Sequence, residues 1–275
     1  MTPSSNGCAT GTGAASHATG ANRSLTARVQ RELLTRLASL AVLLLVWQIA
    51  ATAAHSRFLP TVTSVLAAML QQTLSGALPW NLGITLGRVA VAFALSMLAG
   101  CALGIAMGRS RQIDLWLDNI VTVLLNLPAL VLIVLFYVWF GLNETAAIAA
   151  VALNKLPNTA VTMREGTRSL DPALAEMARS FRMSQWRTLR HVILPQLAPY
   201  MVAAARSGLA LIWKIVLVVE LLGRSNGVGF QIQIYFQLFD VTMILAYTLA
   251  FILIVQMIEW AALQPLERWV TRWRR

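Results

Sequence analysis

The chain has 275 residues, of which 57% are apolar and only 12% are charged. Soluble domains contain about 45 to 50% apolar residues, so the composition excludes a soluble protein and predicts an all-α integral membrane fold. The formal charge of +11 does not indicate nucleic-acid binding, because the basic residues lie in short clusters beside apolar spans.

Residues 1–24 consist mainly of Gly, Ala, Ser, Thr and Asn. Such a segment has almost nothing to bury, so we predict a disordered cytoplasmic tail. A secretory signal peptide is not expected, because the first apolar core begins near Leu37, after Arg23, Arg28, Arg31 and Arg36. Residues 25–275 are predicted to form a single transmembrane domain.

A helix that crosses about 30 Å of hydrocarbon needs about 20 mostly apolar residues. Six stretches are predicted to be such helices: Leu37–Ala54, Gly83–Met107, Ile120–Phe140, Thr145–Met163, Ala198–Leu222 and Val241–Leu263. Only Gly141-Leu-Asn-Glu144 separates the third from the fourth, which predicts a tight hairpin. A short amphipathic helix is expected over Thr63–Leu74, lying along the outer surface.

The arginines give the orientation, because cytoplasmic segments are enriched in basic residues. Only Arg57 and Arg224 fall in the proposed outer segments. Sixteen fall in the proposed inner ones: Arg23, Arg28, Arg31, Arg36, Arg109, Arg111, Arg164, Arg168, Arg179, Arg182, Arg187, Arg190, Arg268, Arg272, Arg274 and Arg275. Both termini are therefore predicted to be cytoplasmic.

Within the second span, Ser96, Gly100, Gly104 and Gly108 repeat every four residues. They form one small-residue face, on which another helix backbone can approach closely. We interpret this face as a packing surface.

Between Arg164 and Gln196 the chain leaves the predicted membrane. Asp171-Pro172 is typical of a helix start, with an Asp N-cap and a proline at the first helical position. Ser184 is a second candidate N-cap, and Leu194-Pro195 is expected to end the second helix. The pattern alone leaves two alternatives open: a knob that docks on another protein, or a hairpin that lies on the anionic inner leaflet.

This loop resembles the EAA loop of permeases from binding-protein-dependent ATP-binding cassette importers. The family pattern is E-A-A, three residues, G, nine residues, an aliphatic residue, one more residue, then L-P. Glu176, Met177 and Ala178 stand for E-A-A, Val192 for the aliphatic residue, and Leu194-Pro195 for L-P. Arg182 occupies the glycine position, where a positive φ is expected, so either the turn differs or the helix continues.

The resemblance covers nearly everything after Arg57 and extends to the nitrate, sulfonate, taurine and bicarbonate branch, through segments such as A-L-I-W-K-I-V-L-V-V-E-L-L-G from Ala210. It implies a bacterial inner-membrane permease, expected as a homodimer in membrane lipid, with two cytoplasmic ATPases and an external or periplasmic solute-binding protein. It also implies a small anionic substrate. ATP would be used by the partner subunit, and no cofactor is expected in this chain.

Polar residues inside the predicted spans are candidates for the translocation pathway, because a charge in a bilayer is unfavourable unless it is paired or hydrated. Pro128 is expected to kink the third span, and Arg88 and Arg206 are expected to snorkel. Lys155 and Lys214 either present positive charge to an anion, or they snorkel or are neutralised by Glu220 and Glu144. The full candidate set is Asn126, Pro128, Asn154, Lys155, Lys214 and Glu220.

An enzyme is not expected, because the chain has no G-x-x-x-x-G-K-[ST] loop, and neither its histidines nor Cys8 and Cys101 form a catalytic or metal-binding pattern. The remaining alternative is a secondary transporter driven by an ion gradient. Such transporters often have two related halves, and no convincing internal repeat is present in this sequence.

Overall fold

The computed structural model describes residues 34, 35, 38, 39, 41–54, 56, 58–263 and 265. Every regular element in that part of the chain is helical. Several predictions lie outside these residues: the tail of residues 1–24, and the orientation arginines at 23, 28, 31, 36, 57, 268, 272, 274 and 275. The chain divides into two units, residues 1–64 and 65–275, which are described separately.

In the first unit, an apolar helix covers Ala41–Ala54, within the first predicted span. The chain then turns back on the helix. The indole of Trp47 donates to the carbonyl oxygen of Pro60 (3.1 Å), and Gln48 Oε1 accepts from the amide of Val62 (2.9 Å). Helix α2 (Val62–Leu74) begins at this turn and matches the predicted amphipathic helix to within one residue.

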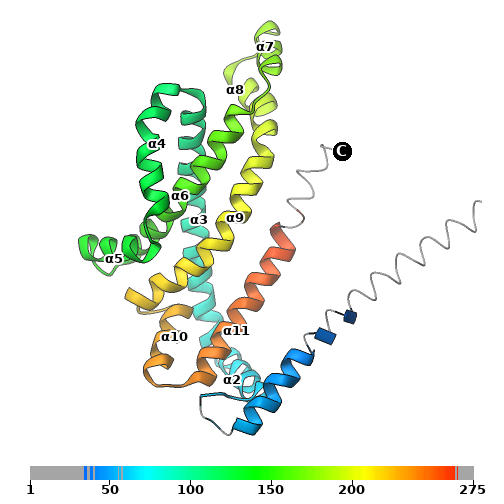
Figure 1. The fold of residues 1–275 in the computed structure, drawn as a ribbon, viewed down its shortest axis with the longest axis vertical. Coiled ribbons are helices and arrows are strands. Elements are labelled where there is room, and N and C mark those ends of the chain that lie inside the picture. The colour runs from blue at the N-terminus through cyan, green and yellow to red at the C-terminus, as the bar shows by residue number, and fades with distance from the viewer. Residues whose placement is uncertain are drawn as a thin grey trace, which may run out of the picture. The chain divides into compact units, whose positions relative to one another are not determined.

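The second unit is built around α3 (Ala77–Arg109), α6 (Glu144–Arg168) and α9 (Leu194–Gly223). The small-residue face of α3 packs on α6, as predicted. A Cβ added to Gly104 would lie 2.4 Å from the carbonyl oxygen of Ala160, and one added to Gly108 would lie 2.5 Å from Thr167 Cβ. Larger side chains would hold the two backbones apart, so these glycines bring α3 and α6 together (Figure 1).

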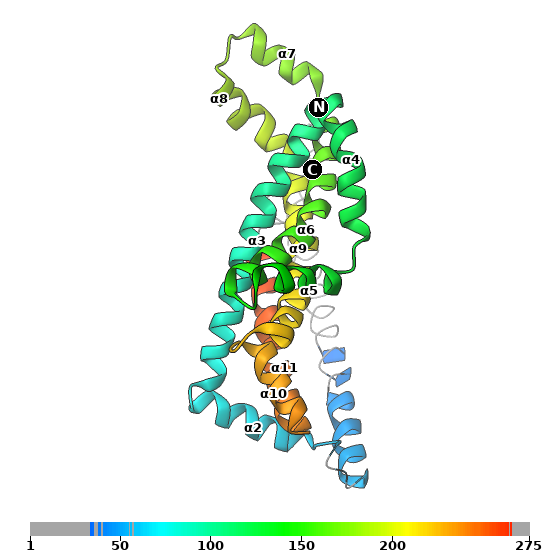
Figure 2. The same cartoon turned by 90° about the vertical axis from the view of Figure 1, so that its left-hand side faces the viewer.

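The third predicted span is wrong as a single helix. Helix α4 (Arg111–Asn126) and helix α5 (Ala129–Phe140) are bent by 100° relative to each other. Pro128 lacks an amide and disfavours helical geometry at the preceding residue, and Leu127 is accordingly extended, with φ −72° and ψ 124°. The proline therefore breaks the span where a kink was expected, and the chain turns sharply there (Figure 2).

The predicted helix end at Leu194-Pro195 is also wrong. Helix α8 (Gln185–Thr188) passes through one π-helical turn, η1 (Leu189–Ile193), directly into α9. In that turn the amide of Leu194 donates to the carbonyl oxygen of Leu189. The wider turn accommodates a proline, whose missing amide and bulky ring would otherwise disrupt a regular α-helix.

The remaining helical segments follow α9 along the chain. Helix α10 (Val228–Gln237) was not predicted, whereas α11 (Val241–Ile258) and the π turn η2 (Glu259–Leu263) match the sixth span. By length and composition, three described helices can cross a membrane: α3, the continuous Gln185–Gly223 helix and Val241–Ala261. The α4–α5 pair counts as a fourth if it forms one broken span.

Candidate functional site

The loop between α6 and α9 contains two short capped helices, as predicted. Helix α7 (Pro172–Ser180) begins at Asp171, whose Oδ1 accepts from the amide of Ala173 (2.9 Å). The hydroxyl of Ser184 accepts from the amide of Arg187 (3.4 Å) at the start of α8. These caps satisfy amides that have no partner within their own helix. Figures 1 and 2 show α7 and α8 projecting from one end of the second unit, which we call the loop end.

Arg182 adopts the conformation that glycine would adopt, with φ 48°. Its amide donates to the carbonyl oxygen of Arg179 (2.9 Å), and the amide of Met183 donates to that of Ala178 (2.9 Å). This pair of bonds defines a Schellman motif, with Arg182 at the left-handed position that follows the helix. Both alternatives expected for Arg182 are therefore wrong: the helix does not continue, and the turn keeps the geometry of a glycine turn.

The loop has a closed inner side and an apolar outer side. Ala178 and Val192 are buried and line a partly open cavity of about 350 Å³ between the two helices. On the outside, Phe181 and Trp186 are 76% and 67% exposed, and Leu174 and Met177 are also exposed. Large apolar side chains that project from a loop are typical of a protein contact surface.

The other candidate loop residues lie around this surface. Glu176, Leu194 and Pro195 are all exposed. Gln196 joins the two ends of the loop, because its Oε1 accepts from the amide of Asp171 (3.0 Å) and its Nε2 donates to the carbonyl oxygen of Val192 (2.9 Å). Ser169 adds a second link at the base of the loop, because its hydroxyl lies 2.8 Å from the hydroxyl of Tyr200.

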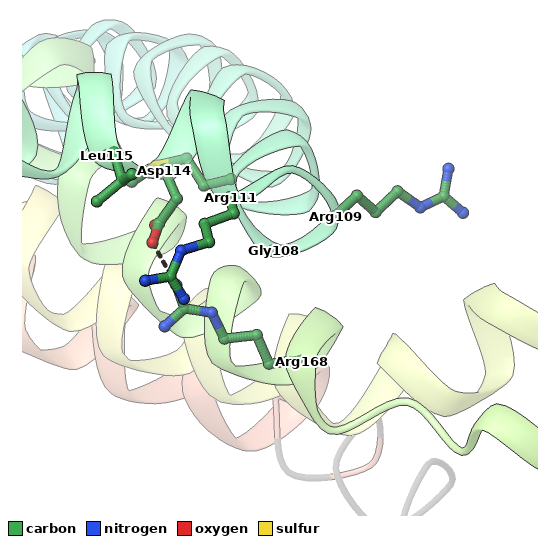
Figure 3. Close-up of a pocket in the computed structure, with 7 residues that line it drawn as sticks. Gly108, Arg109, Arg111, Asp114, Leu115 and Arg168 are labelled. Atoms are coloured by element: carbon green, nitrogen blue, oxygen red, sulfur yellow. Dashed lines mark hydrogen bonds and ion pairs between the residues drawn. The ribbon is translucent and has the colours of Figure 1, made fainter.

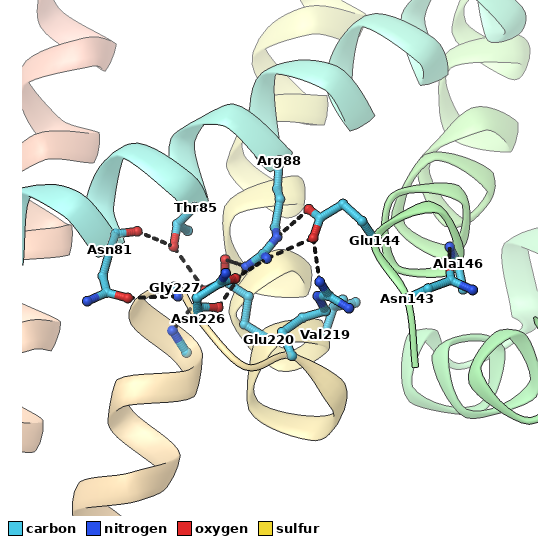
Figure 4. A network of polar contacts seen from close by, with 12 residues as sticks. Asn81, Thr85, Arg88, Asn143, Glu144, Ala146, Val219, Glu220, Asn226 and Gly227 are labelled. Carbon is cyan, nitrogen blue, oxygen red and sulfur yellow. Dashed lines mark hydrogen bonds and ion pairs between the residues drawn. The ribbon is translucent and has the colours of Figure 1, made fainter. Parts of the chain in front are cut away.

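At the opposite end of the second unit, the charged residues form a network that was not predicted (Figure 4). Arg88 on α3 donates to Glu144 on α6 at 2.6 and 2.9 Å, and to Glu220 on α9 at 2.7 Å. Arg224 also donates to Glu144, at 2.7 Å. Two arginines thus neutralise two glutamates.

Glu220 is completely buried, and neutral donors complete its coordination. The hydroxyl of Thr85 donates to its Oε2 at 2.9 Å, and the amide of Gly229 donates to the same oxygen at 2.8 Å. The amide of Gly227 donates to Asn81 (2.9 Å), and Gly227 has φ 104°. The network therefore fixes the α9–α10 loop against α3.

This network corrects two expectations. Arg88 is buried and paired, so it does not snorkel. Glu220 and Glu144 pair with arginines in the structure and do not neutralise Lys155 or Lys214. The four charged residues lie near the outer ends of three different predicted spans. Their similar depth in the membrane was the sequence signal that could have predicted the network.

The proposed pathway residues are dispersed. Lys155 is 2% exposed and lies among α3, α6 and α9: a Cβ on Gly208 would be 2.8 Å from Lys155 Cε and 3.7 Å from the ring of Phe93. Lys155 forms no side-chain hydrogen bond or ion pair within the described part of the chain. Lys214, Asn126 and Pro128 are exposed, and Asn154 is half-buried. Among the described residues of this unit, Lys155 is a buried cation without a counter-ion.

Comparison with known proteins identifies relatives over most of the chain. Residues 96–261 match the family of binding-protein-dependent transport system inner membrane components. The taurine transport system permease protein TauC of Escherichia coli is 30% identical over 252 residues, covering 89% of this chain and 91% of TauC. The bicarbonate transport system permease protein CmpB of Synechococcus elongatus is 28% identical, covering 72% of each chain.

A solved structure has the same fold. An inward-facing structure of the MetNI methionine ABC transporter matches 73% of this chain and 99% of its own chain, with a TM-score of 0.61 and 19% identity. At this level of identity the likeness concerns the fold alone. The matched family region contains the whole loop between α6 and α9 and the buried Lys155.

Proposed function

The chain belongs to the family of binding-protein-dependent transport system inner membrane components, the permeases of ATP-binding cassette importers, and from this membership we propose that it forms the translocation pathway for a small anion. Nitrate, sulfonates, taurine and bicarbonate are the proposed substrate class, supported by relatives named for taurine and bicarbonate transport. The observation that carries the proposal is the family match over residues 96–261.

We propose six spans with both termini in the cytoplasm of a bacterial cell, in its inner membrane. The spans are the Ala41–Ala54 helix, α3, the broken α4–α5 pair, α6, the Gln185–Gly223 helix and α11. The arginine distribution supports this orientation, which places the loop end in the cytoplasm. Cysteine labelling at the loop end and at the network end, from each side of the membrane, tests it.

The loop between α6 and α9 is proposed to dock on a cytoplasmic ATPase, which binds and hydrolyses ATP while this chain carries no cofactor. Ala178, Arg182 and Val192 would maintain the shape of the loop. Glu176, Met177, Leu194 and Pro195 would lie at or beside the contact. The exposed side chains of Phe181 and Trp186 suit a groove on the partner, since aromatic residues dominate the binding energy of many interfaces.

Phe181→Ala tests this docking role. Loss of an aromatic anchor reduces binding by about 2 kcal/mol, so affinity for the ATPase should fall about 30-fold. Trp80→Ala is the matched control, because Trp80 is an equally exposed aromatic residue at the start of α3, far from the loop. Equal ATPase binding by wild type and Phe181→Ala would contradict the proposed contact.

The complete transporter is proposed to contain two copies of this permease in membrane lipid, two ATPases and an external solute-binding protein. Family membership supports this assembly. Uptake into proteoliposomes tests the importer function: the anion should accumulate only when the ATPase, ATP and the binding protein are all present. Uptake by this chain alone, driven by a proton or sodium gradient, would instead identify a secondary transporter.

Lys155 is proposed to provide positive charge to the anion during translocation, together with Lys214, Asn154 and the α4–α5 break at Asn126 and Pro128. A buried ammonium without a counter-ion is unfavourable, and a passing anion would neutralise it. Glu220 would act indirectly, by holding α9 in place. Lys155→Met should therefore reduce uptake more than it reduces ATPase binding, and unchanged uptake would eliminate this role.

A further inference from the structure

One side of the second loop helix carries apolar and basic side chains together. Trp186, Arg190 and Leu194 recur every four residues through α8 and η1 to the start of α9, and Arg187 lies beside them. Thr188 is on the opposite side of the helix and lines the cavity between α7 and α8. The row of Trp186, Arg187, Arg190 and Leu194, which we call the α8 surface, therefore faces away from that cavity.

The α8 surface is exposed, and its charges are not neutralised by the described part of the chain. Arg187 and Arg190 make no side-chain hydrogen bond or ion pair with any described residue, and they flank the exposed Trp186. By contrast, Arg168 at the same end of the unit pairs with Asp114, as Figure 3 shows. Tryptophan and arginine are enriched at protein interfaces, so this side of α8 has the composition of a contact surface.

The turn before α8 repeats the combination of an aromatic side chain and an arginine. Phe181 and Arg182 are both exposed, and Arg182 likewise has no side-chain partner among the described residues. Residues 181–194 contain three arginines and no acidic residue. Positive charge therefore surrounds both aromatic side chains, which favours a partner surface of negative charge.

The direction of α8 favours a protein over the anionic inner leaflet as that partner. Gln185–Gly223 is one continuous helix of 39 residues, and its spanning part was predicted to begin at Ala198. Trp186 lies twelve residues before Ala198, which is about 18 Å along the helix. The head-group layer of one leaflet is only about 5 to 8 Å thick. Trp186 therefore stands beyond the leaflet, and Figures 1 and 2 show α7 and α8 projecting from the end of the unit.

We propose that the α8 surface and the Phe181–Arg182 turn dock in an apolar groove of the cytoplasmic ATPase whose edge carries Asp and Glu side chains. This inference rests on the proposed docking role and adds the chemistry of the partner surface. Phe181 and Trp186 fill the groove, and the three arginines Arg182, Arg187 and Arg190 pair with carboxylates at its edge. Such pairs at the edge of an interface weaken as salt rises, whereas apolar contacts do not.

Binding of the purified ATPase subunit of the same transporter to the full-length protein in nanodiscs tests the charge of the groove. At about 0.1 M salt, Arg187→Gln/Arg190→Gln should weaken binding about five- to ten-fold, and at about 0.5 M salt less than about two-fold. Arg109→Gln/Arg111→Gln is the matched control, because it removes the same charge where α3 meets α4 (Figure 3). Arg109 lines the cavity between α7 and α8, on the side of α8 away from Trp186. An equal loss in the two double variants would overturn the acidic edge.

Phe181→Ala separates this inference from the docking role on which it rests. It should weaken ATPase binding by the same factor at both salt concentrations, because it removes an apolar contact. If Phe181→Ala weakens binding while wild-type affinity does not change with salt, the loop docks but the groove has no acidic edge. If neither Phe181→Ala nor Arg187→Gln/Arg190→Gln weakens binding, the docking role itself is wrong.

Hydrogen exchange of residues 181–190 in nanodiscs tests the inner leaflet as the alternative partner. Without the ATPase, exchange should be the same in phosphatidylglycerol and phosphatidylcholine, because the segment stands beyond the head groups. Addition of the ATPase should slow it in both lipids. Slower exchange in phosphatidylglycerol alone would show that the arginines contact anionic lipid, and would overturn the proposal.

Discussion

Arg88→Met should destabilise the protein by about 3 to 5 kcal/mol, because it removes the one cation that pairs with the fully buried Glu220 among the described residues. In the native structure Arg88 contacts Glu220 at 2.7 Å and Glu144 at 2.6 Å. After the change, Glu220 retains only two neutral donors, the hydroxyl of Thr85 and the amide of Gly229. A buried carboxylate with neutral donors alone is far less stable than a paired one.

Arg224→Met is the matched control from the same network. Glu144, its partner, is 45% exposed and retains Arg88 after the change. Arg224 also donates to the carbonyl oxygen of Leu142 at 3.0 Å, so a loss of about 1 kcal/mol is expected. The two arginines therefore differ because one serves a buried carboxylate and the other a hydrated one.

Denaturant titration of the full-length protein in detergent measures both free energies of unfolding. The double variant Arg88→Met/Glu220→Gln removes the buried charge together with its partner, so it should recover about 1 to 3 kcal/mol relative to the sum of the single variants. Equal destabilisation by Arg88→Met and Arg224→Met, or strict additivity in the double variant, would refute the assignment of Arg88 as the counter-ion of Glu220.

Two further changes test local geometry. Arg182→Gly should stabilise the loop turn by about 0.5 to 1 kcal/mol, because glycine adopts the positive φ without steric strain. The amide hydrogen exchange of Met183 should then slow about two- to five-fold, whereas Arg182→Ala should leave the exchange rate unchanged. Gly104→Ala should destabilise the protein by about 1 to 3 kcal/mol, because the added Cβ would lie 2.4 Å from the carbonyl oxygen of Ala160. Gly83→Ala, on an open part of the same helix, should instead stabilise it by about 0.5 to 1 kcal/mol in the same titration, and a matching loss at both glycines would contradict the packing argument.

Local sequence signals predicted the structure correctly where that structure depends on residues within one short segment. Residues within a few positions of each other determine the helix caps at Asp171 and Ser184. They also determine the extent of α2 and α11. The four-residue repeat from Ser96 to Gly108 also predicted its packing role, because only small side chains permit the backbones of two helices to approach closely. In each case the pattern that carries the prediction lies within one short segment of the chain.

Two prolines show where local reasoning was insufficient. Pro128 was expected to kink a span, but it separates two helices by 100°, and Pro195 was expected to end a helix that continues through a π turn. Proline always removes the same amide. Whether the chain then bends, breaks or widens depends on the packing of the flanking segments, which the sequence window does not contain.

The sequence by itself determined that this is a membrane protein, that basic segments lie between its apolar helices, and that one loop has the EAA spacing. Apolar length, charge distribution and motif spacing are all properties of the linear chain. Only the tertiary structure decided which charges meet. Arg88, Glu144, Glu220 and Arg224 come from distant segments, and their pairing leaves Lys155 without a counter-ion in the part of the chain that the structure describes. Electrostatic partners depend on distances of a few ångströms, and only the packing of α3, α6 and α9 sets those distances.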